Sequence, residues 1–228
     1  MDTLQLLTGF RFLDSFFPSG GFAFSSGLEA AVQGGMVRDA AGLQSFVSDS
    51  LRAGLGKREA VVVGLVLDAA CDKALDRVIE LDRQLHSMQL SRESRRASRQ
   101  MGKQVARLAA EHFSGHAIIQ DYLAVVEAER TFGHVPVSLG LTLHASGWGK
   151  QESIAGFLYQ AVIGYNSAAL KLLSIGQRES QRLLHEWTPL IAEISALAAT
   201  ATDLSSWTPL HDIYAMRHAR LESRLFRS

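Results

Sequence analysis

The sequence contains a single cysteine, Cys71, among 228 residues. A lone cysteine cannot form an internal disulfide bond, and such sparing use is typical of proteins in a reducing compartment. The first residues also lack the basic start and apolar core of a secretory signal peptide, so we expect a cytoplasmic protein. Because Cys71 follows an apolar run, the pattern favours a packed, buried thiol over a catalytic one.

The sequence has no excess charge of either sign, with 23 lysines and arginines against 23 aspartates and glutamates. A chain of zero formal net charge has no overall field that would draw it to nucleic acid or to an anionic membrane. Two uncharged windows, 131–149 and 153–170, approach the length of a membrane span. Both contain polar side chains, so they predict buried helices of a soluble domain instead.

Common catalytic motifs are absent from the sequence. It has no Gly-x-x-x-x-Gly-Lys phosphate loop, no Gly-x-Gly-x-x-Gly, no Gly-x-Ser-x-Gly elbow and no His-Glu-x-x-His. The usual nucleotide cradle, the esterase nucleophile and the zinc-protease helix are therefore excluded, and we expect no catalytic residues.

Histidine is better represented, with eight residues. His112 and His116 have the spacing of two metal ligands on one helix face, although the Ser-Gly pair between them argues against a continuous helix. His211 and His218 lie two turns apart and are candidate ligands for a metal such as nickel or zinc. Hydrogen-bonded helix histidines are the favoured interpretation, and a metal-binding enzyme that uses scattered histidines is an alternative.

Apolar residues recur at helical spacing along most of the chain. The pattern is clearest over 153–172, and residues 3–16 predict a helix that buries most of its surface. The apolar run 60–67 has no second run to pair with as a strand, so it predicts a buried helix that continues to Cys71. A Thr-Pro pair at 188–189 predicts the start of a new helix. Together these patterns predict an all-α, single-domain bundle of about nine or ten helices.

The most basic part of the chain is 92–107, which carries six arginines and lysines. A basic helix can bind phosphate groups, but no aromatic side chains alternate with these cations. A solvated face, or pairing with acidic helices of the same chain, is the favoured interpretation. A helical nucleic-acid-binding or regulatory protein that uses 92–107 is the alternative function.

The C-terminal stretch 208–228 begins like a helix, with Thr208 as a cap and Pro209 at the first helical position. It ends on an apolar pair, Leu225 and Phe226, and such a pair needs a surface to dock on. Residues 208–228 therefore predict a C-terminal helix followed by a partner-docking tail, and a tail that folds back on the core of its own chain is the alternative. A continuing helix would gather four arginines on one face: Arg217, Arg220, Arg224 and Arg227.

Five segments resemble the urease accessory protein UreF family, and they occur in the family's order. They are Phe17–Glu29, Arg92–Gly102, His134–Gly140, Tyr159–Gln181 and Asp212–Ser228. The resemblance implies an all-α homodimer that is a scaffold rather than an enzyme. It implies a position between the accessory protein UreD (UreH in some organisms) and the GTPase UreG, with the urease apoprotein as the final partner. It also implies nickel in transit and no tightly bound cofactor.

The resemblance places the partner-binding residues in two segments. In the glycine-rich loop they are Pro18, Gly20, Phe22, Ser25, Gly27 and Glu29. In the tail they are Asp212, Met216, Arg217, His218, Leu221, Arg224, Leu225, Phe226 and Ser228. Family tails become ordered on binding UreD/UreH, which implies docking through Leu225 and Phe226. The loop at Phe22 and the Arg224 position are associated with recruitment of the GTPase.

Overall fold

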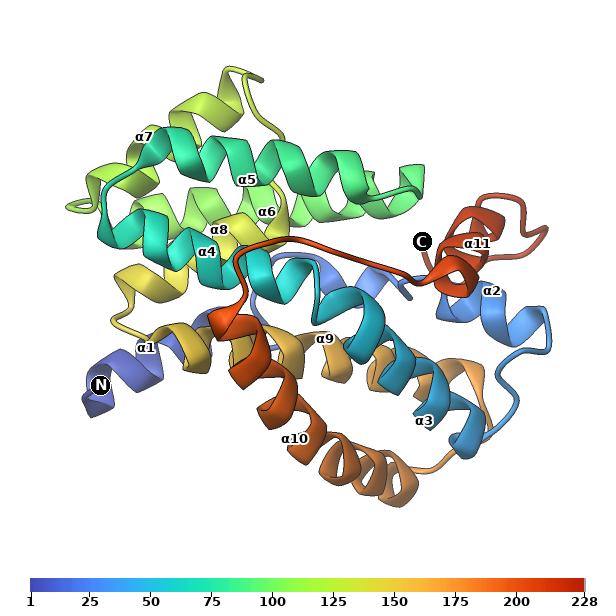
Figure 1. Ribbon diagram of the computed structural model, residues 1–228. Helices are drawn as coiled ribbons and strands as arrows, with labels where there is room; N and C mark the ends of the chain where they lie inside the picture. Colours follow the sequence, from blue (N-terminus) through green and yellow to red (C-terminus); the bar gives the residue numbers. More distant parts are fainter. Residues whose placement is uncertain (228) are drawn as a thin grey trace.

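A computed structural model describes residues 1–227, and the regular structure in this range is entirely helical (Figure 1). The all-α prediction is confirmed, and the eleven α-helices of the described range slightly exceed the expected number. The helices run in chain order as α1 (Thr3–Leu13), the 3-10 helix η1 (Gly21–Ala23), α2 (Leu28–Gln33), α3 (Ala40–Asp49), the π-helical turn η2 (Ser50–Leu55), α4 (Glu59–Cys71), α5 (Leu75–Met88), α6 (Arg92–His112), α7 (Ala117–Glu127), α8 (Val135–Ala145), α9 (Lys150–Leu172), α10 (Gln177–Thr200) and α11 (Pro209–His218).

Helices α4 and α8 form the centre of one hydrophobic core, and α9, α6 and α10 pack around them. Almost every residue of α4 and α8 is buried, as expected for helices that are apolar on all sides. Their close approach depends on Gly140, where a methyl group would come within 3.0 Å of Val66. The predicted helix through 60–67 is therefore confirmed, because tertiary packing outweighs the modest helix propensity of valine.

A buried carboxylate fixes the turn that leads into α8. Asp82 on α5 is fully buried and accepts four hydrogen bonds from the turn. The donors are the hydroxyl of Thr131 at 2.7 Å and the backbone N–H groups of Phe132, Gly133 and His134 at 2.8, 2.8 and 3.0 Å. These four donors stabilise the buried carboxylate, and they hold the turn in one conformation.

The side chain of His134 continues this polar cluster into the core. Its Nδ1 lies 3.0 Å from the Ser98 hydroxyl, and its Nε2 lies 3.0 Å from Nδ1 of His86. Burial lowers the pKa of His134 to about 4, and the nearby cations of Arg95 and Arg99 act in the same direction. The ring is therefore neutral near pH 7 and joins α5, α6 and α8 by hydrogen bonds.

Helix α1 differs from its prediction, because it does not bury most of its surface. Leu4, Leu7 and Phe10 form an exposed apolar stripe, although the ring of Phe10 also packs against that of Trp148 between α8 and α9. Phe12, on the opposite face, is fully buried. The helix lies at the edge of the molecule, so only one face meets the core (Figure 1).

Two further expectations are wrong. Cys71 is exposed at the end of α4, with its Sγ 3.8 Å from Nδ1 of His144, because the core ends just before this residue. Helix α10 runs without a break through Pro189, although proline removes one helical hydrogen bond. Trp187 and Leu190 are buried on either side of the proline, so burial of the continuous apolar face maintains the helix.

No helix within residues 1–227 is both long enough and apolar enough for a membrane span.

Substitutions at two helical glycines test the packing of α6 against the turn before α8. A methyl group at Gly102 would overlap the carbonyl oxygen of Gly133, whereas one at Gly164 meets nothing within 4 Å. We expect Gly102→Ala to lower the free energy of unfolding by about 2 kcal/mol and Gly164→Ala to raise it by up to ~1 kcal/mol. Urea denaturation measures both, and equal effects would contradict this packing.

The neutral state of His134 predicts a pH-dependent stability. Its folded pKa lies below the ordinary 6.5, so between pH 6.5 and about 4 the unfolded chain binds a proton that the folded chain does not. Stability therefore falls as the pH falls through this window, by about 3 kcal/mol from this residue. Urea denaturation of the wild type and of His134→Asn, repeated across the window, should show a steeper loss for the wild type. Parallel curves would refute the assignment.

Candidate partner-binding site

The two segments that the sequence singles out, the loop 18–27 and the tail 208–227, lie against each other. Helix α2, which follows the loop, packs beside α11 (Figure 1). Gly27 caps α2 with a positive φ of 85°, and a Cβ there would come within 3.1 Å of the backbone nitrogen of Ala215. Glycine is required at this position both for the backbone conformation and for the contact with α11.

Glu29, in the first turn of α2, connects the two segments. Its side chain is 2% exposed, and Oε2 accepts hydrogen bonds from Nε2 of His218 at 2.9 Å and from the backbone N–H of Phe226 at 3.1 Å. Oε1 accepts the backbone N–H of Leu225 at 2.6 Å. The hydroxyl of Ser25 accepts the backbone N–H of Glu29 at 3.3 Å. One buried carboxylate thus holds both the end of α11 and the segment beyond it.

His218, the last residue of α11, is fully buried between two carboxylates. Its Nδ1 lies 2.8 Å from Oε2 of Glu93 on α6, opposite the contact of Nε2 with Glu29. Carboxylates only accept hydrogen bonds, so both ring nitrogens of His218 face acceptors. Arg224 completes the Glu29 network (Glu29, Glu93, His218 and Arg224) by donating to Oε1 of Glu93 at 3.0 Å. The contacts of the two carboxylates with His218 and Arg224 offset the cost of their burial.

Both candidate metal ligands in the tail are used in these structural contacts. The two ring nitrogens of His218 are occupied, and Nε2 of His211 lies 2.8 Å from the backbone carbonyl oxygen of Phe46. The interpretation as hydrogen-bonded helix histidines is confirmed. His112 and His116 lie on different helices, because α6 ends at the first and α7 begins after the second. Among the described residues, no three His, Cys, Asp or Glu side chains are placed to hold a metal ion.

The arginine row of the tail does not form one helical face, because α11 ends at His218. The chain beyond it folds back around Arg224, whose NH2 donates to the carbonyl oxygen of Ala219 at 2.6 Å and whose Nε donates to that of Leu221 at 3.5 Å. A helix end leaves such carbonyl groups unpaired, and the guanidinium satisfies them. Arg217, by contrast, lies over the ring of Tyr214.

Phe226 docks on its own chain. Its side chain is 6% exposed, the ammonium group of Lys171 lies 5.3 Å from its ring centroid, and the next residue, Arg227, donates its backbone N–H to the carbonyl of Ala23 in η1 at 2.8 Å. In this conformation Phe226 follows the alternative expectation, a tail folded back on its own chain, whereas Leu225 is exposed. Ser228 lies outside the described residues.

The remaining predicted residues divide into exposed and buried sets. Ser25, Glu29 and His218 are buried and support the site from beneath. Asp212 is half-buried, and burial raises the pKa of its carboxyl. Gly20 has a positive φ of 81° and caps η1. The predicted residues with exposed side chains are Pro18, Phe22, Met216, Arg217, Arg224 and Leu225, and Leu221 is partly exposed.

An apolar stripe on the outer side of α11 was missed from the sequence. Leu210, Ile213 and Met216 on α11 are 44, 40 and 44% exposed, and Trp207, two residues before the helix begins, is 80% exposed. Only Met216 was predicted to bind a partner. The regular spacing of three residues was the available signal, and we refer to these four residues as the α11 stripe.

The basic helix α6 is partly committed to its own chain. Arg95 donates to the backbone carbonyls of Gln89 and Leu90, and Arg107 pairs with Glu127 at 3.1 Å. Arg99 donates to the carbonyl of Phe132 and lies over its ring. Intramolecular contacts thus occupy three of the six cations, and of these three Arg107 alone pairs with an acidic helix as the sequence favoured.

The described residues thus form an all-helical domain with an exposed apolar stripe beside a buried hydrogen-bond network. The UreF family model matches residues 37–188. Urease accessory protein UreF of Agrobacterium fabrum is 35% identical over 225 residues, which cover 98% of this chain and 96% of the relative. The same-named proteins of Rhodopseudomonas palustris and Cereibacter sphaeroides are 33% and 32% identical, covering 93% and 98% of this chain and 88% and 98% of their own lengths. The chain belongs to the urease accessory protein UreF family.

Removal of the charge on Glu29 should release the tail. We expect Glu29→Gln to speed tryptic cleavage at the tail arginines by about tenfold or more, because a buried carboxylate with three donors loses its charge. Glu222→Gln, at an exposed position of the same segment, is the matched control. Mass spectrometry of the released peptides follows the cleavage. If the two variants are cleaved at the same rate, the Glu29 network does not hold the tail.

Proposed function

We propose that this protein is a nickel-insertion scaffold for urease maturation, which bridges UreD/UreH and the GTPase UreG and is not itself an enzyme. Membership of the UreF family supports this proposal, since its relatives are named urease accessory proteins. The main structural support for this proposal is the α11 stripe. It is exposed at the surface, and the Glu29 network binds the C-terminal end of the helix that carries it.

The α11 stripe is proposed to dock on UreD/UreH. The opposite face of α11 packs on α2 and α6, so the stripe is presented on a fixed helix. A preorganised helix loses little conformational entropy on binding, and large apolar side chains such as Trp207 commonly dominate the binding energy. Leu225, exposed beyond the end of α11, and the partly exposed Leu221 are proposed to add to this docking surface. These residues replace Phe226 as the proposed anchors.

The loop around Phe22 and the segment around Arg224 are proposed to recruit UreG. The hydrogen bond between Arg227 and Ala23 joins the tail to η1, so both segments contribute to one surface. The guanidinium of Arg224 donates from Nε, NH1 and NH2 to its own chain. We therefore favour a role for Arg224 in recruiting UreG over a catalytic role in which it would stabilise the phosphate group that the GTPase transfers.

The protein is further proposed to act as a homodimer in the cytoplasm. The α1 stripe of Leu4, Leu7 and Phe10 is an apolar surface separate from α11, and the two helices lie at opposite ends of Figure 1. The scaffold thus has one apolar surface for UreD/UreH and another for a second copy. Nickel passes through the assembly to the urease apoprotein, with no tightly bound cofactor in this chain.

Charge introduced into the α11 stripe tests the docking proposal. We expect Ile213→Asp to weaken pull-down of UreD/UreH by about tenfold or more, because a buried carboxylate in an apolar interface lacks a partner. Leu197→Asp, at an exposed position on α10, is the matched control and should bind normally. Circular dichroism checks that both variants fold. Unchanged pull-down by Ile213→Asp would rule out α11 as the docking surface.

Arg224→Ala tests the recruitment of UreG, with Arg220→Ala at an exposed tail position as its control. We expect loss of UreG pull-down only for Arg224→Ala, since the tail segment that it orders would open. Co-expression with UreD/UreH, UreG and the urease apoprotein should yield active urease only with this chain present. If Arg224→Ala retains binding to both UreG and UreD/UreH, the tail assignment is wrong.

A further inference from the structure

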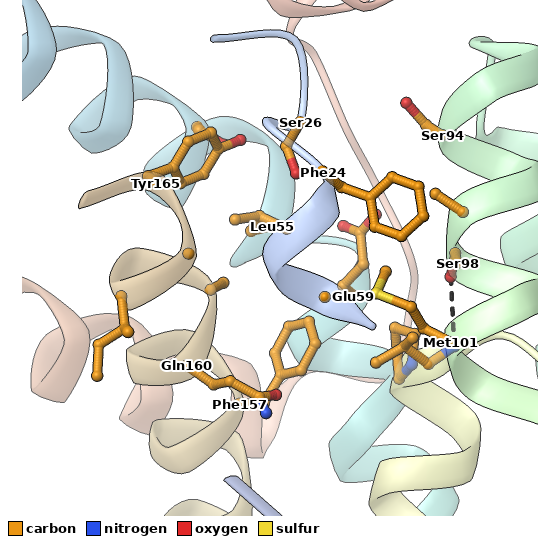
Figure 2. Close-up of a pocket in the computed structure, with 18 of the residues that line it drawn as sticks. Phe24, Ser26, Leu55, Glu59, Ser94, Ser98, Met101, Phe157, Gln160 and Tyr165 are labelled. Carbon is orange, nitrogen blue, oxygen red and sulfur yellow. Dashed lines mark hydrogen bonds between the residues drawn. The ribbon is translucent and has the colours of Figure 1, made fainter. Parts of the chain in front are cut away.

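Helix α6 carries different side chains on its two sides. On one side, Ser94, Ser98 and Met101 line a cavity of about 320 Å³ beneath the glycine-rich loop (Figure 2). The other side carries four cations at positions i, i+4, i+7 and i+11, which align along a helix. They are Arg92, Arg96, Arg99 and Lys103, and we refer to them as the α6 basic stripe. With a rise of about 1.5 Å per residue, the stripe follows the helix for roughly 16 Å.

The α6 basic stripe is left unneutralised by its own chain. Within residues 1–227, the side chains of Arg92, Arg96 and Lys103 form no hydrogen bond or ion pair. Arg99 uses only Nε, which donates to the carbonyl of Phe132 at 3.4 Å. Like charges three or four residues apart repel each other and destabilise a helix. A partner that brings negative charge to the stripe would relieve this repulsion.

Nearby carboxylates do not offset the charge of the stripe. Glu93 belongs to the Glu29 network, and Glu127 pairs with Arg107 at 3.1 Å. Asp82, beneath the turn before α8, is occupied by its four donors. Of these nearby carboxylates, Glu129 is the one without a hydrogen bond or ion pair to the described residues. The stripe therefore keeps most of its positive charge.

A cleft of about 280 Å³ lies between the stripe and the turn that follows α7. Three cations of its lining, Arg96, Arg99 and Lys103, stand against one carboxylate, Glu129, which leaves two net positive charges. Guanidinium groups bind carboxylates through two parallel hydrogen bonds, so the cleft suits an acidic side chain. Arg92, one turn before Arg96 on α6, offers a contact to another carboxylate of the same segment.

The same cleft offers no free aromatic ring to a nucleotide base. Phe132, the aromatic residue of its lining, is stacked on His86 with the ring centroids 3.5 Å apart, and Cζ of Arg99 lies 5.5 Å from the centroid of the Phe132 ring. Proteins that bind single-stranded nucleic acid combine cations with aromatic rings on which bases stack. A chain without net charge also lacks the long-range field that draws a protein to nucleic acid. These observations favour a protein partner.

We propose that the α6 basic stripe binds an acidic segment of a partner protein. Carboxylates of this segment pair with Arg96, Arg99 and Lys103 in the cleft, and a further carboxylate reaches Arg92. Charge complementarity of this kind raises the rate of association and selects the partner. None of the four cations belongs to the surfaces proposed above for UreD/UreH, UreG or a second copy. The inference therefore goes beyond the proposed function and does not depend on it.

Fluorescence anisotropy of a labelled peptide of about twelve glutamates, titrated with the full-length protein at about 50 mM salt, tests this proposal. We expect saturable binding of this peptide and none of a glutamine peptide of the same length. The double variant Arg96→Gln/Lys103→Gln should bind the glutamate peptide about fivefold more weakly or worse, because two exposed ion pairs are lost. Binding should also weaken at about 200 mM salt, since these charges are exposed to solvent.

The matched control is the double variant Lys57→Gln/Arg178→Gln. It removes two exposed cations outside α6 and should leave peptide binding unchanged. Glu129→Gln provides a change of opposite sign, which a folding defect does not mimic. Removal of the carboxylate from the cleft should strengthen binding of the glutamate peptide by about twofold or more. Circular dichroism confirms that all variants fold.

A labelled oligonucleotide of about twelve uridines separates a protein partner from nucleic acid, and it should bind no more tightly than the glutamate peptide. The proposal is overturned if the glutamate peptide does not bind, or if the oligonucleotide binds more tightly. It is also overturned if the Arg96→Gln/Lys103→Gln variant binds normally, or if Glu129→Gln weakens binding.

Discussion

The hydrogen bond between Glu29 and His218 joins two parts of the chain that are 189 positions apart. It sets the end of α11, because the same carboxylate also holds the backbone of Leu225 and Phe226. Buried charges are tolerated only when they are paired, so Glu93 and Arg224 are needed as much as the first two residues. The outward direction of the α11 stripe and the closeness of the loop to the tail both depend on this arrangement.

Much of the helical core could be predicted because its sequence pattern and its environment agree. Helix α9 keeps an apolar period over its whole length, and α4 has no partner strand, so only a helix satisfies its backbone. The exposed side of α1 could not be predicted, since Leu4 and Leu7 would suit a covered helix equally well. Which face is covered depends on distant helices. The path of α10 through Pro189 likewise depends on the buried residues around it.

The candidate site was predicted as two separate segments, and the sequence did not indicate that they bind each other. Contacts between residues so far apart leave no local periodicity, and a buried glutamate such as Glu29 looks like any residue of a first helical turn. The apolar end of the tail was expected to dock, on a partner or on its own core, and the sequence did not decide between the two; in the structure Phe226 lies near Lys171 of its own chain. The α11 stripe could have been found from the spacing of its residues, but the row of arginines in the same segment was taken as the main helical pattern instead.

The connection between Glu29 and residues 218–227 has a consequence for synthesis. During synthesis the loop and α2 are made before residues 218–227. The carboxylate of Glu29 therefore lacks its donors from His218, Leu225 and Phe226 until those residues have been made. A growing or truncated chain can therefore bury most of its core and still lack the joined loop and tail.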